Sequence, residues 1–527
     1  MNNRKAYIIG NGLAGISTAF YLTQESDIDP KNVYIFDNVS FDGGSLDAFD
    51  YTDQNYYFMR GFRMLEENVY SAIFDLMSKV PLPDNPSKTL KDDFNEFNKE
   101  VKTYSVSRLV EKGKAINARK FTLKFSDSIK ILVLLATPEK KLENVTIADF
   151  FSTEFFKSNF WAEFATTFSF QPWHSAEEMK RYILRFIQCS PVLDSQTCIR
   201  STRYNQMESL VLPVKSELQK KGVNFVYSTA ITDIDFNEKD GKLEASKIYT
   251  KSNNQEQTIE VKDEDYVFMS LGSMTACYSV GSMTQAPSAK TATMDESIDW
   301  QLWNKLAKKH KCFGKPEVFG SDTLKSRWVS FTITFTDNTF CELLEEITKT
   351  TAGKEGPITI KDSNWFIAFA LPYNPHFKNQ PQNMRLLWGY GMFADKEGNF
   401  VKKPMSDCTG EEILYEIIHH LRFEHKLNEI MKSATCIPCM LPFITSQFMP
   451  RTMSDRPKVV PECSKNFAII GQFCEIPEDI VFTLEYSVRS AQTAVYTLLG
   501  KPEKTTPIFK GWHRLKYLFG AFRTVFR

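Results

Sequence analysis

The stretch AYIIGNGLAGISTAFYL, residues 6–22, decides the fold class of this chain. Residues 6–9 form an apolar run that predicts a buried strand, and the apolar pattern that follows the glycines predicts a helix. Between strand and helix stand Gly10, Gly12 and Gly15, in the spacing G-x-G-x-x-G. Glycines at these places let the backbone turn tightly and approach a pyrophosphate at the N-terminus of the helix. We therefore expect a Rossmann-type nucleotide-binding unit at the start of the chain.

A second apolar run, VYIF, leads directly to Asp37, which lies 22 positions after Gly15. A carboxylate at the end of the second strand of such a unit accepts the ribose hydroxyls of a dinucleotide. It also repels a 2′-phosphate, so the expected cofactor has an unmodified ribose and is either FAD or NAD. An ordinary strand, turn and helix without a ligand is the alternative, and it fits less well because strand, helix and acid all agree.

Length and composition narrow the class of protein. A chain of 527 residues is too long for one core, and we expect two or three domains. Its 64 Lys plus Arg balance 64 Asp plus Glu, which argues against nucleic acid as a partner. We see no signal peptide and no apolar run that could span a membrane, and expect a cytoplasmic protein. The ten cysteines are irregularly spaced, so we expect reduced thiols and no metal site, although Cys436 and Cys439 resemble half of one.

Insertions are expected to split the nucleotide-binding unit. Its first part is expected at 1–84, its second at 203–289 and its last at 463–500. A mainly helical cap or substrate domain is expected at 85–202, which is rich in charge and phenylalanine. A further substrate domain with short strands such as WVSFTITF is expected at 290–462. The predicted fold class is therefore α/β, a Rossmann-type domain with inserted domains and a helical C-terminal tail.

The tail, residues 501–527, is predicted to be a basic amphipathic helix. From 508 to 527 it has five Lys or Arg residues and no acidic residue. Helical spacing brings four apolar side chains to one face: Leu515, Phe519, Phe522 and Phe526. Such a helix binds anionic membrane surfaces, so we expect peripheral contact with the inner face of the membrane. A helix docked on its own protein is the alternative.

Ten longer segments, in order from residue 7 to about 499, resemble one family, the oleate hydratases, formerly called myosin-cross-reactive antigens. They include GNGLAG, DGGSLD, MRGFRM, TTFSFQPWHSAEEMKRYILRF, RYNQMESLVLPV, LGSMT, NPHFKNQP and GQFCEIPEDIVFTLEYSVRSAQTAVY. The resemblance implies a hydro-lyase that adds water to the cis-9 double bond of oleate or a related unsaturated fatty acid, giving a 10-hydroxy product. It also implies bound FAD, most active as FADH2, that organises the site without net redox change.

The matched motifs imply the residues that contact the cofactor. They are Gly10, Gly12, Gly15, Asp37, Gly44, Ser45, Arg63, Gly272, Ser273, Phe482, Thr483 and Ser487.

The catalytic positions depart from the family pattern. In the family, a glutamate in R-G-G-R-E-M activates water, and a tyrosine before TTFAF donates the proton. Here the motif reads RGFRM, so Met64 stands where that glutamate would be. Glu66 or Glu67 could supply the carboxylate, although both could simply begin a helix. The segment before TTFSF has no tyrosine; Tyr182 and Tyr204 follow it, and we expect Tyr204 near the site without assigning it as the acid.

Other features bear on substrate and assembly. For the carboxylate of a fatty acid, the NPHF segment offers Asn374 and His376, and Gln188 is a further candidate; a purely structural histidine is the alternative. The R-M motif and the lack of a long N-terminal extension resemble a subgroup thought to be monomeric. Two other functions stay open: a flavin oxidoreductase acting on a lipid or amine, and a lipid-binding flavoprotein without catalysis.

Overall fold

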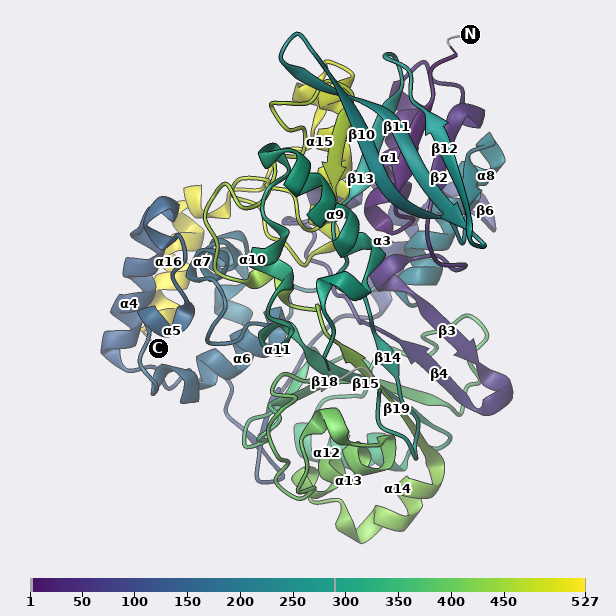
Figure 1. The fold of residues 1–527 in the computed structure, drawn as a ribbon. Coiled ribbons are helices and arrows are strands. Elements are labelled where there is room, and N and C mark those ends of the chain that lie inside the picture. Colours follow the sequence, from purple (N-terminus) through teal and green to yellow (C-terminus); the bar gives the residue numbers. More distant parts are fainter. Residues whose placement is uncertain (1–2, 289–290, 527) are drawn as a thin grey trace.

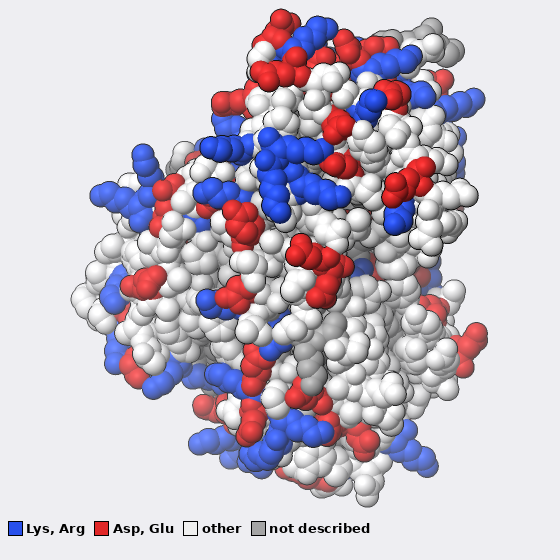
Figure 2. Space-filling model, viewed as in Figure 1, with Lys and Arg blue, Asp and Glu red and all other residues white. Residues whose placement is uncertain are grey.

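The fold is that of a computed structural model, which describes residues 3–288 and 291–526. Figure 1 shows three parts: a sheet-and-helix part near the N-terminus, a helical part that contains the C-terminus, and a second sheet covered by helices. Among the helices of these described ranges, none is both long and apolar enough to cross a bilayer. Basic and acidic side chains are interspersed over the face shown in Figure 2.

A five-stranded parallel sheet forms the first part, in the order β20-β13-β1-β2-β9. Its strands are β1 (Ala6–Ile9), β2 (Val33–Phe36), β9 (Asn224–Val226), β13 (Tyr266–Ser270) and β20 (Phe467–Ile470). Helices α1 (Leu13–Glu25) and α15 (Leu484–Leu498) pack together beside it. The predicted α/β class is confirmed, since strands from three distant segments of the chain form one parallel sheet.

A three-stranded antiparallel sheet extends this part. It consists of β10 (Ala230–Lys239), β11 (Lys242–Ser252) and β12 (Gln255–Glu260). Helix α9 (Ile298–Lys309) packs on β10, and α8 (Leu212–Lys221) packs on α1.

An eight-stranded sheet forms the second layered part, in the order β14-β19-β15-β18-β17-β16-β7-β8. The strands are β7 (Leu109–Glu111), β8 (Lys114–Ile116), β14 (Ser279–Val280), β15 (Trp328–Phe335), β16 (Ile358–Ile360), β17 (Ile367–Ala370), β18 (Arg385–Gly391) and β19 (Ala434–Leu441). Helices α12 (Thr339–Thr348), α13 (Gly410–Leu421) and α14 (Leu427–Ser433) lie below it in Figure 1.

Two predicted domain boundaries differ from this arrangement. Strands β7 and β8 lie within the segment expected to be mainly helical, yet β7 pairs in parallel with β16, Val110 opposite Ile360. Strand β14, expected with the nucleotide-binding unit, pairs with β19. The physical reason is burial, because Leu109 and Val110 are fully buried once they join the sheet.

Most of the helical part comes from residues 125–185. Its helices are α4 (Phe125–Ala136), α5 (Ile147–Phe150), α6 (Asn159–Phe168) and α7 (Ala176–Arg185). The C-terminal helix α16 (Leu515–Val525) lies among them, beside residues 187–192 (Figure 1). Shorter connecting elements are α2 (Ser71–Lys79), α3 (Leu90–Glu100), α10 (Pro316–Gly320), α11 (Thr323–Ser326), β3 (Ala48–Tyr51), β4 (Tyr56–Met59), β5 (Pro81–Leu82) and β6 (Asn85–Thr89).

Buried ion pairs join the helical part to the nucleotide-binding part. Arg185 on α7 pairs with Asp479 at 3.0 Å, and Arg489 on α15 pairs with the same carboxylate at 2.8 Å. Both arginines also hold the segment before α16, because Arg489 donates to the carbonyl of Thr506 and Arg185 donates to that of Phe509 at 2.9 Å. The base of the tail is therefore fixed to the interior of the protein.

One cysteine pair corrects the expectation of reduced thiols. Cys312 and Cys463 form a disulfide across 151 positions of sequence, so their spacing gave no sign that they meet. Cys436 and Cys439 are buried as free thiols on β19. In the described part of the chain, no three His, Cys, Asp or Glu side chains are placed to hold a metal ion.

Candidate functional site

A cavity of about 480 Å³ lies at the carboxyl ends of the parallel strands, and we call it the glycine-motif cavity. Residues directly after four of the strands line it: Gly10 after β1, Asp37 after β2, Leu271 after β13 and Gly471 after β20. An open α/β sheet binds its ligands at this edge. All twelve residues predicted to contact the cofactor line this one cavity.

The glycines allow backbone contacts that a side chain would prevent. A Cβ atom on Gly15 would lie 1.9 Å from the carbonyl oxygen of Gly10, so only glycine lets α1 start this close to β1. A Cβ on Gly44, whose φ is +57°, would lie 3.1 Å from the Cα of Gly12. The two loops therefore approach each other through bare backbone at the wall of this cavity.

Among the three carboxyl residues that line this cavity, Asp37, Glu296 and Asp299, two have a raised pKa. Asp37 accepts hydrogen bonds from the N–H groups of Asn11 at 2.8 Å and Val39 at 3.1 Å, while its burial raises its pKa. Asp299, on α9, is the second; burial, and then the nearby Asp37, raise its pKa to about 7. The sequence analysis missed Asp299 because no glycine pattern accompanies it.

Arg60 and Arg63 come from one motif but differ in their partners. Arg60 is paired, since its guanidinium donates to Asp47 at 2.7 Å and to the carbonyl of Gly44 at 2.6 Å. The Arg63 guanidinium makes neither an ion pair nor a hydrogen bond with any residue in 3–288 or 291–526, and it lies 5.4 Å from the centre of the Phe482 ring. Burial lowers its pKa. A buried cation without an anion is costly, so Arg63 is suited to bind one.

A smaller cavity of about 120 Å³, the inner cavity, adjoins the first. Arg63, Phe482 and Thr483 line both. Its other walls are mainly aromatic: Phe62, Tyr70, Phe168, Tyr182, Phe186, Trp328, Phe369, Trp388 and Tyr390. Met64 and Glu66 also line it, and Glu66 is the one carboxylic acid on its wall.

The two candidate carboxylates, Glu66 and Glu67, lie in different environments in the structure. Glu66 is buried and accepts hydrogen bonds from the N–H of Val69 at 2.6 Å and from the Asn68 amide at 2.9 Å. Burial is the main influence on its pKa, which is raised. Glu67 is exposed to solvent and does not line the inner cavity, which corrects the prediction that it belongs to the site. The turn before α2 imposes this difference, because adjacent side chains on a turn point in different directions.

Three tyrosines line the inner cavity, and Tyr204 is not among them. The Tyr182 hydroxyl donates to the carbonyl of Val481 at 2.5 Å, and the Tyr390 hydroxyl donates to that of Thr166. Tyr70 is the third. Tyr204 lies outside because a turn closed by Ser209 holds its backbone and its ring lies 5.9 Å from the Lys378 ammonium group, which corrects the expectation for this residue.

The predicted carboxylate-binding residues lie outside the cavity walls. His376 is buried edge-on to Phe62, and burial lowers its pKa to about 3, so it is neutral and supplies no charge. Asn374 is bonded to the side chain of Gln380 in a surface turn. Gln188 lies near Glu66, and neither atom of its amide makes a hydrogen bond with the described residues.

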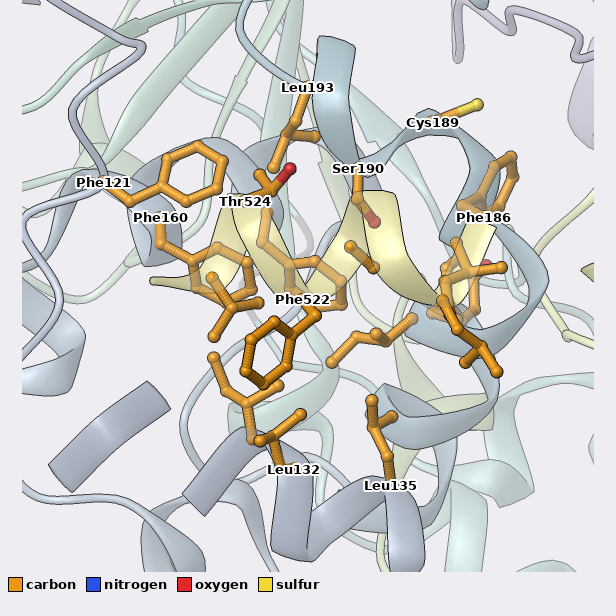
Figure 3. Close-up of a pocket in the computed structure, with 18 of the residues that line it drawn as sticks. Phe121, Leu132, Leu135, Phe160, Phe186, Cys189, Ser190, Leu193, Phe522 and Thr524 are labelled. Atoms are coloured by element: carbon orange, nitrogen blue, oxygen red, sulfur yellow. The ribbon is translucent and has the colours of Figure 1, made fainter. Parts of the chain in front are cut away.

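A third cavity, of about 470 Å³, lies under the C-terminal helix, and we call it the apolar cavity. Figure 3 shows Phe522 and Thr524 of α16 in the middle of the view, with Phe121 and Phe160 to the left and Leu132 below. Phe168, Tyr182 and Phe186 line both this cavity and the inner one. The three cavities therefore adjoin one another in a row, from the glycine loops to α16.

The sequence of the chain that forms these cavities is similar to sequences of known proteins. Residues 3–496 match the model described as MCRA family. The chain belongs to this family. It is 35% identical over 536 residues to oleate hydratase of Streptococcus pyogenes serotype M49 (strain NZ131), which covers 99% of this chain and 90% of the relative. It is 31% identical over 547 residues to linoleate hydratase of Lactiplantibacillus plantarum, with 95% of each protein covered.

Among solved structures, an oxidoreductase from Methanosarcina mazei covers 94% of this chain and 100% of its own, with 12% identity and a TM-score of 0.48.

The structure of this MCRA-family chain also brings in residues that the sequence analysis missed. Gln206 holds the backbone of Arg63, and Trp328 and Tyr390 face the inner cavity from the eight-stranded sheet. The signal for Gln206 was available, since it lies in the matched segment RYNQMESLVLPV. Tyr70 had no such signal, because its importance comes from the shape of the cavity.

Proposed function

We propose that this protein is a fatty acid hydratase, a hydro-lyase that adds water to the cis-9 double bond of oleate or a related unsaturated fatty acid. The product is the 10-hydroxy fatty acid, and there is no net redox change. The observation that carries this proposal is the similarity to an oleate hydratase and a linoleate hydratase over almost the whole chain. The row of an inner cavity with a carboxylate and a large apolar cavity supports it.

FAD is the cofactor we propose for the glycine-motif cavity. The donor set fits it: glycine loops and the start of α1 for the pyrophosphate, Asp37 for the ribose, and the N-terminus of α15 with Arg63 at the opposite end. When bound, and most active as FADH2, the flavin would contribute electrostatics beside the inner cavity. The close approach of Gly12 and Gly44 also fits this proposal, because a side chain at Gly44 would push the two loops of the cavity wall apart.

Glu66 is the residue we propose to activate water. Hydration of an isolated alkene needs a base to orient water at one carbon and an acid to protonate the other, both shielded from bulk solvent. Glu66 is buried at the wall of the inner cavity, which Met64 also lines. In this proposal Glu66 supplies the carboxylate that Met64 does not.

The apolar cavity is the place we propose for the hydrocarbon chain. Its lining is almost entirely Phe, Leu, Ile and Val, which suits an acyl chain. Because it shares Phe168 and Phe186 with the inner cavity, one extended fatty acid could occupy both. We also propose Gln188, which lies near Glu66 but outside the cavity walls, as a polar contact that the bound substrate reaches.

We also propose contact with anionic membranes, through two helices. Helix α16 exposes Leu515 and Phe519, 82% and 64% accessible, and α4 exposes Phe125 at 74%. Ile129 and Val133 continue the apolar stripe of α4, and the rings of Phe125 and Phe526 join the two helices at 5.7 Å. Exposed Lys and Arg residues flank the stripe, and the described residues of α4 and α16 include no exposed acid. An apolar face with a basic border suits an anionic lipid surface.

One experiment tests the hydratase proposal. Purified protein is incubated with oleate, FAD and dithionite in H₂¹⁸O, and the products are analysed by mass spectrometry. We expect a product that is heavier than oleate by one labelled water, with the hydroxyl at carbon 10. Unchanged oleate in a sample with bound FAD would favour a lipid-binding flavoprotein, and substrate-dependent bleaching of the flavin without dithionite would favour an oxidoreductase.

We expect the protein to act as a monomer, as proposed for the subgroup with the R-M motif. Light scattering after size-exclusion chromatography tests this directly. A mass near twice the 60.7 kDa of the chain would contradict it.

A further inference from the structure

One tyrosine hydroxyl on the wall of the inner cavity has no hydrogen-bond partner among the residues that the structure describes. Of the three tyrosines there, Tyr182 and Tyr390 each donate their proton to a backbone carbonyl. The Tyr70 hydroxyl makes no hydrogen bond with any residue that the structure describes, although Tyr70 is buried and lines the cavity. Its proton is therefore free to be given to a ligand.

Tyr70 stands next to Glu66 in a single turn. The N–H of Tyr70 donates to the carbonyl of Glu66 at 3.1 Å, which places the two residues one above the other, four positions apart. Both side chains line the inner cavity. A carboxylate and a phenol thus reach the same small space from one rigid segment, as an acid and base acting on one double bond require.

Arg63 supplies the positive charge on the same wall. The phenols that influence its guanidinium are, in order, Tyr70, Tyr182 and Tyr390. Since no carboxylate in the described ranges pairs with it, its charge is available to an oxygen that becomes negative. A preorganised cation in a water-poor site stabilises such a charge more strongly than water does.

We propose that Tyr70 is the proton donor of the hydration reaction, and that Arg63 is a positioning residue that stabilises the phenolate formed at Tyr70. This inference rests on the proposed hydratase function. It fills the role left open by the absence of a tyrosine before the TTFSF segment.

The step balances without an oxidant or a reductant. The O–H bond of Tyr70 breaks, and its proton forms a C–H bond with one alkene carbon through the π electron pair. The oxygen of water forms a C–O bond with the other carbon, and Glu66 accepts a proton from that water. The proton on Glu66 then returns to the Tyr70 phenolate, so that both residues are restored and one water has been added.

The surroundings of Tyr70 explain why it needs the cation. Burial, and then the carboxylate of Glu485, raise its pKa, so the phenol is protonated at neutral pH. Glu66 and Asp479 act in the same direction, and Arg185 opposes them. Arg185 is already paired with Asp479 at 3.0 Å, whereas Arg63 has no ion pair with any residue in the described ranges. Arg63 is therefore the cation that can stabilise the phenolate when the proton leaves Tyr70.

The test compares Tyr70→Phe with Tyr182→Phe and Tyr390→Phe in the FAD-loaded protein. For Tyr70→Phe we expect kcat for oleate hydration to fall by about a hundredfold or more, the usual contribution of a general acid. KM for oleate, FAD affinity and thermal midpoint should stay close to those of the wild type. The other two variants should lose much less kcat, since their hydroxyls are bound to the backbone.

A second variant changes the acidity of residue 70 without removing its hydroxyl group, so that an effect on folding is not mistaken for an effect on catalysis. Insertion of 3,5-difluorotyrosine at position 70 keeps the shape of the side chain and lowers the pKa of its phenol, so the alkaline limb of the kcat–pH profile should move to lower pH. Arg63→Lys should retain more kcat than Arg63→Met, because it keeps the charge.

The proposal is overturned by an active Tyr70→Phe variant, by an equal loss in Tyr182→Phe or Tyr390→Phe, or by an unmoved pH profile in the fluorinated protein. A wild-type protein that forms no hydroxy acid would instead remove the hydratase function itself.

Discussion

The side-chain amide of Gln206 holds the backbone of Arg63 at two points. Its oxygen accepts the N–H of Arg63 at 3.3 Å, and its nitrogen donates to the carbonyl of Arg63 at 2.9 Å. The same nitrogen also donates to the hydroxyl of Thr202 at 3.1 Å. Gln206 thus fixes the place of an unpaired guanidinium between two cavities from a position outside their walls.

Replacing Gln206 by leucine should remove the two hydrogen bonds that hold the backbone of Arg63. Each lost hydrogen bond is worth about 1 kcal/mol, so we expect kcat/KM for oleate to fall by about tenfold, with a similar loss of FAD affinity. Steady-state kinetics and FAD titration measure both. The matched control is Gln219→Leu on the exposed side of α8, which should behave as wild type. If both variants had the same kcat/KM and FAD affinity, the proposed role of Gln206 in holding Arg63 would be contradicted.

Glu66→Gln should remove the water-activating carboxylate while keeping its size. We expect hydration of oleate to fall by about a hundredfold or more, because the amide cannot accept a proton. The exposed neighbour gives the control, since Glu67→Gln should keep wild-type turnover. Since burial raises the pKa of Glu66, wild-type activity should also fall with decreasing pH at a higher pH than for an ordinary glutamate. Loss in Glu67→Gln alone would reverse the assignment.

Ala521→Trp should shorten the space available to an acyl chain. Ala521 lines the apolar cavity from α16, and an indole there would occupy part of its volume of about 470 Å³. We expect the ratio of kcat/KM for a C18 over a C14 unsaturated acid to fall by about tenfold, the effect of losing the burial of about two CH₂ groups at about 0.8 kcal/mol each. Ala136→Trp, on the exposed side of α4, is the control. An unchanged ratio would place the chain elsewhere.

Phe125→Ser together with Val133→Ser should weaken membrane binding through α4 alone. We expect flotation with phosphatidylglycerol vesicles to decrease severalfold, because two exposed apolar contacts are lost. The control is Val280→Ser, an apolar residue with 44% exposure on β14 in the other part of the molecule. If the α4 variant floats as the wild type does, α4 takes no part in this surface.

Glu163 should make stability depend on pH. Both of its oxygens are buried and lack hydrogen-bond partners in the described chain, and burial raises its pKa from 4.5 to about 8. Between these values the folded protein holds a proton that the unfolded chain has released. The free energy of unfolding therefore falls as pH rises through this window, by at most about 1.4 kcal/mol per pH unit.

Glu163→Gln should reduce that dependence, since the amide does not titrate. Urea unfolding at pH 5 and pH 8 measures it, with exposed Glu264→Gln as the control. If the free energy of unfolding fell equally between pH 5 and pH 8 in the wild type and in Glu163→Gln, groups other than Glu163 would cause the pH dependence.

Local patterns in the sequence were enough to predict much of the nucleotide-binding part. The run at 6–9, the glycines and Asp37 each act over a few residues, and the structure places them together at the edge of the parallel sheet. The run WVSFTITF likewise became β15, buried along its whole length.

Contacts between distant segments could not be predicted in this way. Cys312 meets Cys463, and β7 joins β16, only because the chain returns to the same place much later. Tyr70 is similar, since a tyrosine near a helix start has no distinguishing pattern. Its free hydroxyl becomes significant only when the neighbouring tyrosines are seen to be bound to carbonyl groups.

The anchoring of residues 506–509 changes how the tail should be studied. Truncation after residue 500 would take away the carbonyls that Arg185 and Arg489 now reach, and would leave two interior guanidinium groups short of acceptors. A shortened protein could then lose lipid affinity simply by unfolding near α7 and α15. Surface substitutions on α16 that leave 501–514 intact separate adhesion to lipid from the integrity of the enzyme.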